Sequence, residues 1–348
     1  MIKVLVVEDS PVVREFLVHI LGADPDIRVV GTAHDGEHAL KAIPRTSPDV
    51  ITMDVHMPGM NGLDATRLIM ETCPTPIVVV SGSADPMVVA TTFEAMEAGA
   101  LAVLRRPAGI GHPDHETTAR ELVQTVKLMS EVKVVRRWAS ARRAAPSPAA
   151  QVPIDPIPGR CRVVAIGAST GGPPVVQTIL SQLPANFPVP ILLVQHMAAG
   201  FVRGFVEWLA HSSRLPVRIA AHNEAILPGH VYVAADDLQM KAARNNRIVL
   251  TQDPPENGMR PSVSSLFRSV AAIYAGDAVA GLLSGMGRDG ADELKLLRDK
   301  GAVTFAQDQA SSVVHGMPGE AIKLDAATLV LPPDKIAAVL ARLAKNKQ

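Results

Sequence analysis

The chain has 348 residues, of which 47% are hydrophobic, 20% charged and 3% aromatic, and its 34 basic residues balance its 34 acidic ones. This length predicts two domains, and the zero net charge argues against a nucleic-acid partner. The two cysteines give neither a disulfide framework nor a metal-binding spacing. The first predicted strand begins at Ile2, and no apolar run approaches the length of a membrane span. The sequence therefore predicts a cytoplasmic protein without membrane insertion.

The first part of the chain, from residue 1 to about 132, alternates short apolar runs with amphipathic stretches. Strand-like runs such as KVLVV, DVITM and PIVVVS are each followed by a segment with helical periodicity. This repeated alternation predicts strands and helices wound into an α/β domain with a parallel, doubly wound sheet. A long helix is expected around residues 116–137.

Polar residues follow the strands of this predicted sheet, at the edge where ligands gather in open parallel sheets. Glu8 and Asp9 follow the first strand and Asp54 follows the third, while Ser81 and Arg106 mark the ends of the fourth and fifth. Asp9 alone is typical of a helix N-cap, but the ordered set is not. Carboxylates so close repel one another unless a cation neutralises them, and an all-oxygen set suits Mg²⁺. Asp54 would then be the nucleophile that accepts a phosphoryl group.

The motifs VVEDS, ITMDVHMPGMNG, VVVSGS and RRP resemble, in this order, the landmarks of response-regulator receiver domains, which have a flavodoxin-like fold. The resemblance covers about the first 120 residues. It implies that Asp54 is the phospho-acceptor. It also implies that Glu8 and Asp9 hold Mg²⁺ together with Asp54, and that the backbone carbonyl of His56 is a further ligand.

The same resemblance implies switch roles for Ser81 and Arg106. Ser81 would meet the phosphoryl oxygens, and Arg106 stands where the family has a lysine followed by a proline, so the Arg106–Pro107 peptide is expected to be cis. Arginine is a planar fork rather than a compact ammonium. The family also usually has an aromatic switch residue where this chain has Val103. Both departures bear on how phosphorylation is coupled to a conformational change.

The alternation stops between residues 140 and 160, where five prolines stand among Ala, Ser and Gly. Such a stretch cannot form a packed element and predicts a partly extended linker. The domains are therefore placed at 1–138 and 161–348, with the linker at 139–160. In the second domain, runs such as RVVAIGA, VPILLVQ and DAVAGLLS predict a mostly parallel sheet, and two runs around Asn245–Asn246 predict an antiparallel edge hairpin.

The run AIGASTGGPP lies between a predicted strand and a predicted helix. A phosphate-binding loop would contain a Lys or Arg, and none is present. The run instead contains G-x-S-x-G, which predicts that Ser169 is a nucleophile. Small neighbours allow a strained backbone that exposes the serine hydroxyl, and the helix N-terminus offers N–H donors to an oxyanion.

A serine nucleophile needs a base and an acid that orients the base. His196 directly follows a buried-type strand and would lie beside Ser169 if the two strands are neighbours. The other histidines weighed for this role are His211, His222, His230 and His315. Asp289, in a Gly-rich turn, is favoured as the acid by a slim margin. Its competitors are Asp236, Asp237 and Asp308. The order Ser, His, Asp differs from that of α/β-hydrolases and predicts a separate arrangement of the triad.

The motifs AIGASTGG, LLVQHM, RPSV, LSGMGRDGA and AQDQASSVVHGMPGEA together resemble the catalytic domain of the protein-glutamate methylesterases of bacterial chemotaxis. A receiver, a linker and this domain in that order is the architecture of the CheB family. The resemblance implies that Ser169 is the nucleophile, His196 the base and Asp289 the orienting acid. It also implies that the oxyanion is stabilised by the backbone amide of Met286 and by Thr170, which flanks the nucleophile.

The resemblance also implies a function. The protein is expected to remove methyl groups from glutamate methyl esters of chemoreceptors, under control of phosphorylation, and to deamidate receptor glutamines. Its expected partners are methylated chemoreceptors and a histidine kinase, with Mg²⁺ at the receiver and no cofactor for the esterase reaction. One departure is Ser264, where the family often has an acid. A non-enzymatic phosphorelay adaptor, a DNA-binding regulator and an esterase of a chemosensory pathway outside motility are the alternatives.

Overall fold

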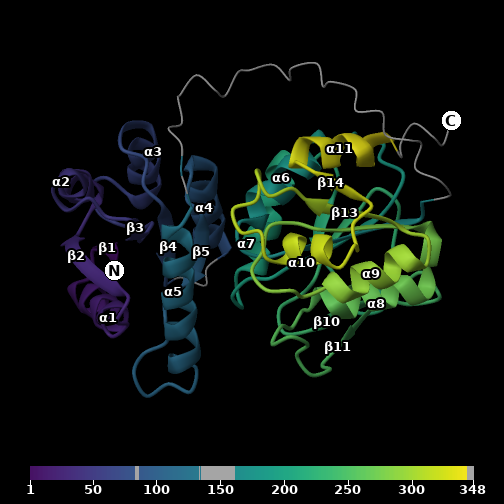
Figure 1. Ribbon diagram of the computed structural model, residues 1–348, viewed down its shortest axis with the longest axis horizontal. Helices are drawn as coiled ribbons and strands as arrows, with labels where there is room; N and C mark the ends of the chain where they lie inside the picture. Colours follow the sequence, from purple (N-terminus) through teal and green to yellow (C-terminus); the bar gives the residue numbers. More distant parts are fainter. Residues whose placement is uncertain (83–85, 133, 135–160, 343–348) are drawn as a thin grey trace. The chain divides into compact units, whose positions relative to one another are not determined.

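The computed structural model describes residues 1–82, 86–132, 134 and 161–342. The chain divides into two compact units, Met1–Gln151 and Val152–Gln348 (Figure 1). Each unit is an α/β structure built on a parallel sheet, so the predicted fold class is confirmed. The linker predicted at 139–160 lies outside the described residues. The helix predicted around residues 116–137 ends earlier than expected, at Ser130, and the described residues 131, 132 and 134 are not helical.

The first unit is a five-stranded parallel sheet with strand order β2-β1-β3-β4-β5. Helices α2, α3 and α4 lie side by side on one face, and α1 and α5 lie on the other (Figure 1). The three central strands, β1, β3 and β4, are rich in β-branched residues and largely buried, as expected for a parallel sheet, whereas the edge strands β2 and β5 are only partly buried. The elements of this unit are β1 (Ile2–Val7), α1 (Pro11–Gly22), β2 (Ile27–Ala33), α2 (Gly36–Thr46), β3 (Val50–Met53), α3 (Gly62–Thr72), β4 (Ile77–Ser81), α4 (Pro86–Ala98), β5 (Ala102–Arg105) and α5 (His115–Ser130).

The second unit is a seven-stranded sheet, parallel throughout, with strand order β14-β13-β12-β6-β7-β9-β8. Helices α6, α7 and α11 pack along one face, and α8, α9 and α10 pack along the other (Figure 1). The elements up to the hairpin are β6 (Val163–Ala168), α6 (Gly172–Gln182), β7 (Ile191–Gln195), α7 (Val202–Ser212), β8 (Val217–Ile219), β9 (Val231–Val233), β10 (Gln239–Ala242) and β11 (Ile248–Thr251). Those after it are α8 (Val263–Ile273), a 3₁₀ turn (Ala275–Asp277), β12 (Ala278–Leu282), α9 (Ala291–Asp299), β13 (Val303–Gln307), α10 (Met317–Lys323), β14 (Leu329–Leu331) and α11 (Pro333–Arg342).

The antiparallel hairpin predicted around Asn245–Asn246 is confirmed as β10 and β11. These two strands form a sheet of their own, and the edge of the main sheet is taken by β8. β8 has only three residues, too few to show a hydrophobic period, which is why the sequence pattern did not single it out. Among the described residues, no helix combines the length and the apolar character that a membrane span requires.

Candidate active site

Three segments of the second unit meet at the carboxyl edge of its sheet. Strand β6 lies between β12 and β7, and Ala168 at its end is in register with Gln195 at the end of β7. Ser169 and His196, the next residue in each segment, are therefore neighbours across the sheet. The N–H of His196 donates to the carbonyl oxygen of Ala168 at 2.9 Å. Asp289 lies in the turn between β12 and α9, on the other side of β6.

Ser169 lies in a tight turn that only small residues can form. Gly171 has a φ of +75°, and a Cβ added there would lie 2.5 Å from the Cβ of Val313. Ser169 itself is not among the residues with positive φ, so the backbone strain expected at the nucleophile is not found, and the left-handed φ of the turn falls on a glycine that adopts it freely. The serine is 9% exposed, so it is nearly buried at the edge of the sheet rather than exposed as expected.

His196 and Asp289 form a buried pair. Nε2 of the imidazole lies 2.9 Å from Oδ2 of the carboxylate, and the two side chains are 8% and 4% exposed. The other ring nitrogen, Nδ1, is also buried and has no hydrogen-bond partner among the described residues. No hydrogen bond joins it to Ser169. The structure thus brings the predicted base and acid into contact and leaves the second imidazole nitrogen available.

The carboxylate of Asp289 is held by several donors at the start of α8. The backbone N–H groups of Val263 and Ser264 donate to it at 2.6 and 3.2 Å, and Nδ2 of Asn257 donates at 3.1 Å. A helix N-terminus favours negative charge, because its N–H groups have no partner inside the helix. Burial alone would raise the pKa of Asp289, but the hydrogen bonds from His196, Ser264 and Val263 lower that pKa to about 2. The group is therefore ionised at neutral pH.

The competing residues have other partners. Asp236 accepts the backbone N–H of Gly200, and Asp237 lies 3.9 Å from the guanidinium of Arg260. Asp308 accepts hydrogen bonds from the backbone N–H and the hydroxyl of Ser311. The rival histidines each place a ring nitrogen against a backbone carbonyl or a serine: His211 with Glu207, His222 with Leu250, His230 with Pro228 and His315 with Ser312. Among these candidate histidines and aspartates, only His196 and Asp289 form an imidazole–carboxylate pair.

The turn after β12 also approaches the serine. A Cβ added to Gly285 would lie 2.8 Å from the Cβ of Ser169, so the backbone of this turn packs directly against the nucleophile. Met286 is the next residue, and Thr170 follows Ser169. Within the described part of the chain, the backbone N–H of neither residue donates a hydrogen bond. Both predicted oxyanion donors therefore lie next in sequence to residues at the nucleophile and keep unused N–H groups.

Sequence reasoning missed Gln195 and Asn257. Nε2 of Gln195 donates to the carbonyl oxygens of Ser169 at 2.8 Å and His196 at 2.9 Å, so one buried amide ties the two main chains together. A glutamine that ends the apolar strand ILLVQ was a usable signal. Asn257 lies in a loop without any periodic pattern, and only the fold brings it to Asp289. Ser264, noted as a departure from the family, accepts hydrogen bonds from Gly290 and Asn257 at its hydroxyl.

The carboxyl edge of the first unit holds the predicted acidic cluster. Ligand oxygens of Glu8, Asp9 and Asp54 all lie within 4.8 Å of one another. Burial, together with the Asp54 carboxylate, raises the pKa of Glu8 to about 7, and burial also raises the pKa of Asp54 against the influence of Arg106. Crowded carboxylates whose charge is this unfavourable fit a divalent cation with oxygen ligands, such as Mg²⁺.

The remaining receiver residues surround this cluster. Ser81 is buried at the end of β4, and its carbonyl oxygen accepts the backbone N–H of Arg106 at 2.8 Å. Nη2 of Arg106 lies 3.2 Å from Glu8, and its Nε is buried without a partner among the described residues. His56 has an exposed side chain. The expectation of a cis Arg106–Pro107 peptide is wrong, because the cis bond of the described chain is Arg260–Pro261.

Comparisons with known proteins match both units. A family model described as CheB methylesterase matches residues 164–340, and one described as response regulator receiver domain matches residues 4–112. The chain is 65% identical over its full length to the protein-glutamate methylesterase/protein-glutamine glutaminase of Nitrosospira multiformis, covering 98% of that protein. It is 57% identical to a protein of the same name, numbered 4, from Geobacter metallireducens, with both chains covered in full. The crystal structure of the Thermotoga maritima CheB methylesterase catalytic domain matches 53% of this chain and all of that one, at 37% identity and a TM-score of 0.51.

Proposed function

We propose that this chain, which belongs to the CheB methylesterase family, hydrolyses glutamate γ-methyl esters of chemoreceptors. The observation that carries the proposal is the buried pair of His196 and Asp289, 2.9 Å apart, beside the strand end that bears Ser169. An ionised acid in contact with an imidazole, next to a serine in a tight turn, is the set of groups that acyl transfer requires.

The two nitrogens of His196 have different tasks in this proposal. Asp289 accepts a hydrogen bond from Nε2, which fixes the tautomer and leaves Nδ1 as the acceptor of the Ser169 proton. A buried nitrogen without a partner costs about 1–3 kcal/mol, and the Ser169 proton would give this nitrogen a partner. Catalytic contacts of this kind are often long or poorly aligned before substrate binds.

The reaction conserves atoms through an acyl-enzyme. The Ser169 oxygen bonds to the γ-carbonyl carbon while its proton passes to His196, and the N–H groups of Met286 and Thr170 stabilise the oxyanion. The C–O bond to the methoxy group then breaks, and His196 returns the proton so that methanol leaves. A water molecule cleaves the acyl-enzyme by the same steps and regenerates the serine. With a glutamine side chain the leaving group is ammonia, which accounts for deamidation.

The receiver unit controls this activity through phosphorylation of Asp54 by a histidine kinase. Glu8, Asp9, Asp54 and the carbonyl oxygen of His56 would hold Mg²⁺, which neutralises the phosphoryl oxygens and the crowded carboxylates. Ser81 would hydrogen-bond to the phosphoryl group.

Arg106 would pair with the same phosphoryl group. Its Nε–H is a donor without a partner among the described residues, and a guanidinium is well matched to phosphoryl oxygens. The esterase reaction needs neither Mg²⁺ nor these receiver residues.

The proposal keeps the domain boundaries predicted from the sequence. These are a receiver at 1–138, a linker at 139–160 and a catalytic domain at 161–348, in a cytoplasmic protein.

Phosphoryl control is tested by replacing its acceptor. Phosphorylation regulates only if the charge at Asp54 favours one conformation of the enzyme over another. The Asp54→Asn variant is therefore expected to keep unstimulated activity and to lose all response to a small-molecule phospho-donor with Mg²⁺. Stimulation equal to that of the unmodified chain would remove Asp54 from the proposal.

The catalytic proposal is tested by methanol release from methylated chemoreceptor. The Ser169→Ala variant is expected to lose turnover by about 10⁴-fold or more, because no other group can form the acyl-enzyme. Ser181→Ala is the matched control, since Ser181 lies on α6 and its hydroxyl only donates to the carbonyl of Thr178. Turnover retained in Ser169→Ala, or lost equally in both variants, would contradict the serine mechanism.

A further inference from the structure

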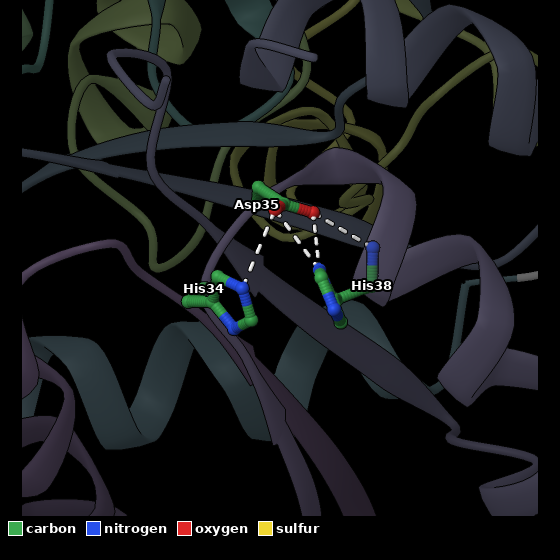
Figure 2. Close-up of side chains that lie close together, drawn as sticks. All are labelled: His34, Asp35 and His38. Carbon is green, nitrogen blue, oxygen red and sulfur yellow. Dashed lines mark hydrogen bonds and ion pairs between the residues drawn. The ribbon is translucent and has the colours of Figure 1, made fainter. Parts of the chain in front are cut away.

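A second group of potential metal ligands lies on the first unit, apart from the acidic cluster. His34, Asp35 and His38 each offer one ligand atom, and these atoms all lie within 4.8 Å of one another. Figure 2 shows the two imidazoles next to each other, each with a ring nitrogen turned towards the Asp35 carboxylate. The proposed esterase mechanism and phosphorylation use none of these three residues.

The backbone brings the three side chains together. Asp35 is the N-cap of α2 and accepts the backbone N–H of His38 at 2.8 Å. His34 precedes the cap and follows β2, while His38 lies in the first helical turn. The imidazole centroids are 3.8 Å apart, so His34 before the cap and His38 after it place their rings next to each other. The helix cap thus orders the carboxylate, and this ordering does not depend on a bound ion.

The spacing of the donor atoms matches a coordination sphere. Nδ1 of His38 lies 2.9 Å from Oδ2 of Asp35, and Nε2 of His34 lies 3.5 Å from the same oxygen. Tetrahedral zinc with bonds of about 2.0–2.1 Å separates neighbouring ligand atoms by about 3.3–3.4 Å. Both nitrogen-to-oxygen separations lie within about 0.5 Å of this value, so they are compatible with an ion held between the donors. Two imidazole nitrogens and one carboxylate oxygen are ligands that favour Zn²⁺ and related ions over Mg²⁺.

We propose that His34, Asp35 and His38 bind a divalent transition-metal ion of the Zn²⁺ class. The two histidine side chains are 55% and 48% exposed, and that of Asp35 is 19% exposed. The site is therefore open on its outer side, where water completes the coordination and the ion exchanges with solvent. The all-oxygen cluster of Glu8, Asp9 and Asp54 differs in donor type, so the two groups select different ions.

The test is a titration of the full chain with Zn²⁺, in buffer with millimolar Mg²⁺, followed by competition with a chromophoric chelator. His34→Ala, His38→Ala and Asp35→Asn each remove one ligand. Asparagine is also a good N-cap, so Asp35→Asn keeps the helix start while it removes the charged oxygen. His112→Ala is the matched control, because His112 is 56% exposed and lies near Asp114 and His115 without forming such a group of ligand atoms.

The expected result is one Zn²⁺ equivalent whose affinity falls at least tenfold in each of the three ligand variants and is unchanged in His112→Ala. Co²⁺ in the same site is expected to give a visible absorption band that His38→Ala lacks. Equal stoichiometry and affinity in the unmodified chain and the ligand variants, or an equal loss in His112→Ala, would overturn the proposal and leave Asp35 as a helix cap only. Methanol release is independent of this result.

Discussion

Each unit has buried acids at one edge of its parallel sheet, and the pKa values of these acids are shifted in opposite directions in the two units. At the edge of the first unit, burial raises the pKa of Glu8 to about 7 and also raises the pKa of Asp54. At the edge of the second, Asp289 is as deeply buried, yet its pKa is lowered to about 2. Similar topology therefore brings carboxylates to the same edge of each parallel sheet, but it does not determine their charge.

The difference lies in the donors around each carboxylate. Asp289 accepts two backbone N–H groups at the start of α8, the Asn257 amide and the His196 imidazole. Glu8 accepts one backbone N–H, from Ser10, and one arm of Arg106, and it faces other acids. The second edge thus stabilises its own negative charge and can orient a base. The first requires an added cation, which suits a site that is switched by a phosphoryl group.

Among changes to the buried acids of the two edges, the largest effect is expected from removing the charge at the second edge. Asp289→Asn is expected to lower kcat for methanol release by about 10³–10⁴-fold, because the amide stabilises neither the tautomer nor the imidazolium of His196. Asp236→Asn is the control, since its carboxylate only caps Gly200, and it is expected to change kcat by less than about tenfold. Similar losses in the two variants would mean that Asp289 has no special role.

A smaller effect is expected from the residue that joins the serine and histidine segments. Gln195→Met keeps the side-chain volume and removes the donor to the carbonyl oxygens of Ser169 and His196. A displacement of the two segments is expected to lower kcat by about 10- to 100-fold with little change in KM. The exposed Gln182 gives the control variant Gln182→Met. An unchanged kcat in Gln195→Met would show that the turn holds its geometry without this amide.

The lowered pKa of Asp289 predicts how stability depends on pH. A carboxyl with a depressed folded-state pKa adds stability above its unfolded pKa, and loses it as pH falls through the folded value. The gap in unfolding free energy between the unmodified chain and Asp289→Asn is expected to shrink by about 1 kcal/mol between pH 5 and pH 3. Urea unfolding at the two pH values measures it. A gap that widens on acidification would contradict the assigned hydrogen bonds.

An effect on stability of similar size concerns the cation at the first edge. Mg²⁺ at about ten times its Kd is expected to stabilise the first unit by about 1.4 kcal/mol, and EDTA to reverse the gain. Asp9 is exposed, so Asp9→Asn is expected to remove the gain without unfolding the unit. Thermal unfolding with and without Mg²⁺ measures this, with Asp64→Asn on α3 as the control. A gain that persists in Asp9→Asn would place the ion elsewhere.

The parts of both edges that could be predicted are those that follow from strand order. Ser169, His196 and Asp54 each come directly after a buried strand, and alternation of strands and helices brings such residues to one edge. The glutamine that ends ILLVQ marks Gln195 as a candidate, but its contact with Ser169 and that of Asn257 with Asp289 could not be predicted, because the sequence separation of these pairs carries no period. Ser169 does not carry the expected strain, because the left-handed φ of the turn falls on Gly171, and the close approach of Val313 to that glycine is contained in no local pattern.

The central claim is that Ser169 and His196 act as one unit, and a double-mutant cycle tests it most directly. Methanol release is measured for Ser169→Ala, His196→Gln and the double variant on the same methylated receptor. If the serine gives its proton to this imidazole, each single variant loses about 10⁴–10⁶-fold and the double variant loses no more than either. Losses that multiply in the double variant, or turnover that survives in His196→Gln, would contradict the account.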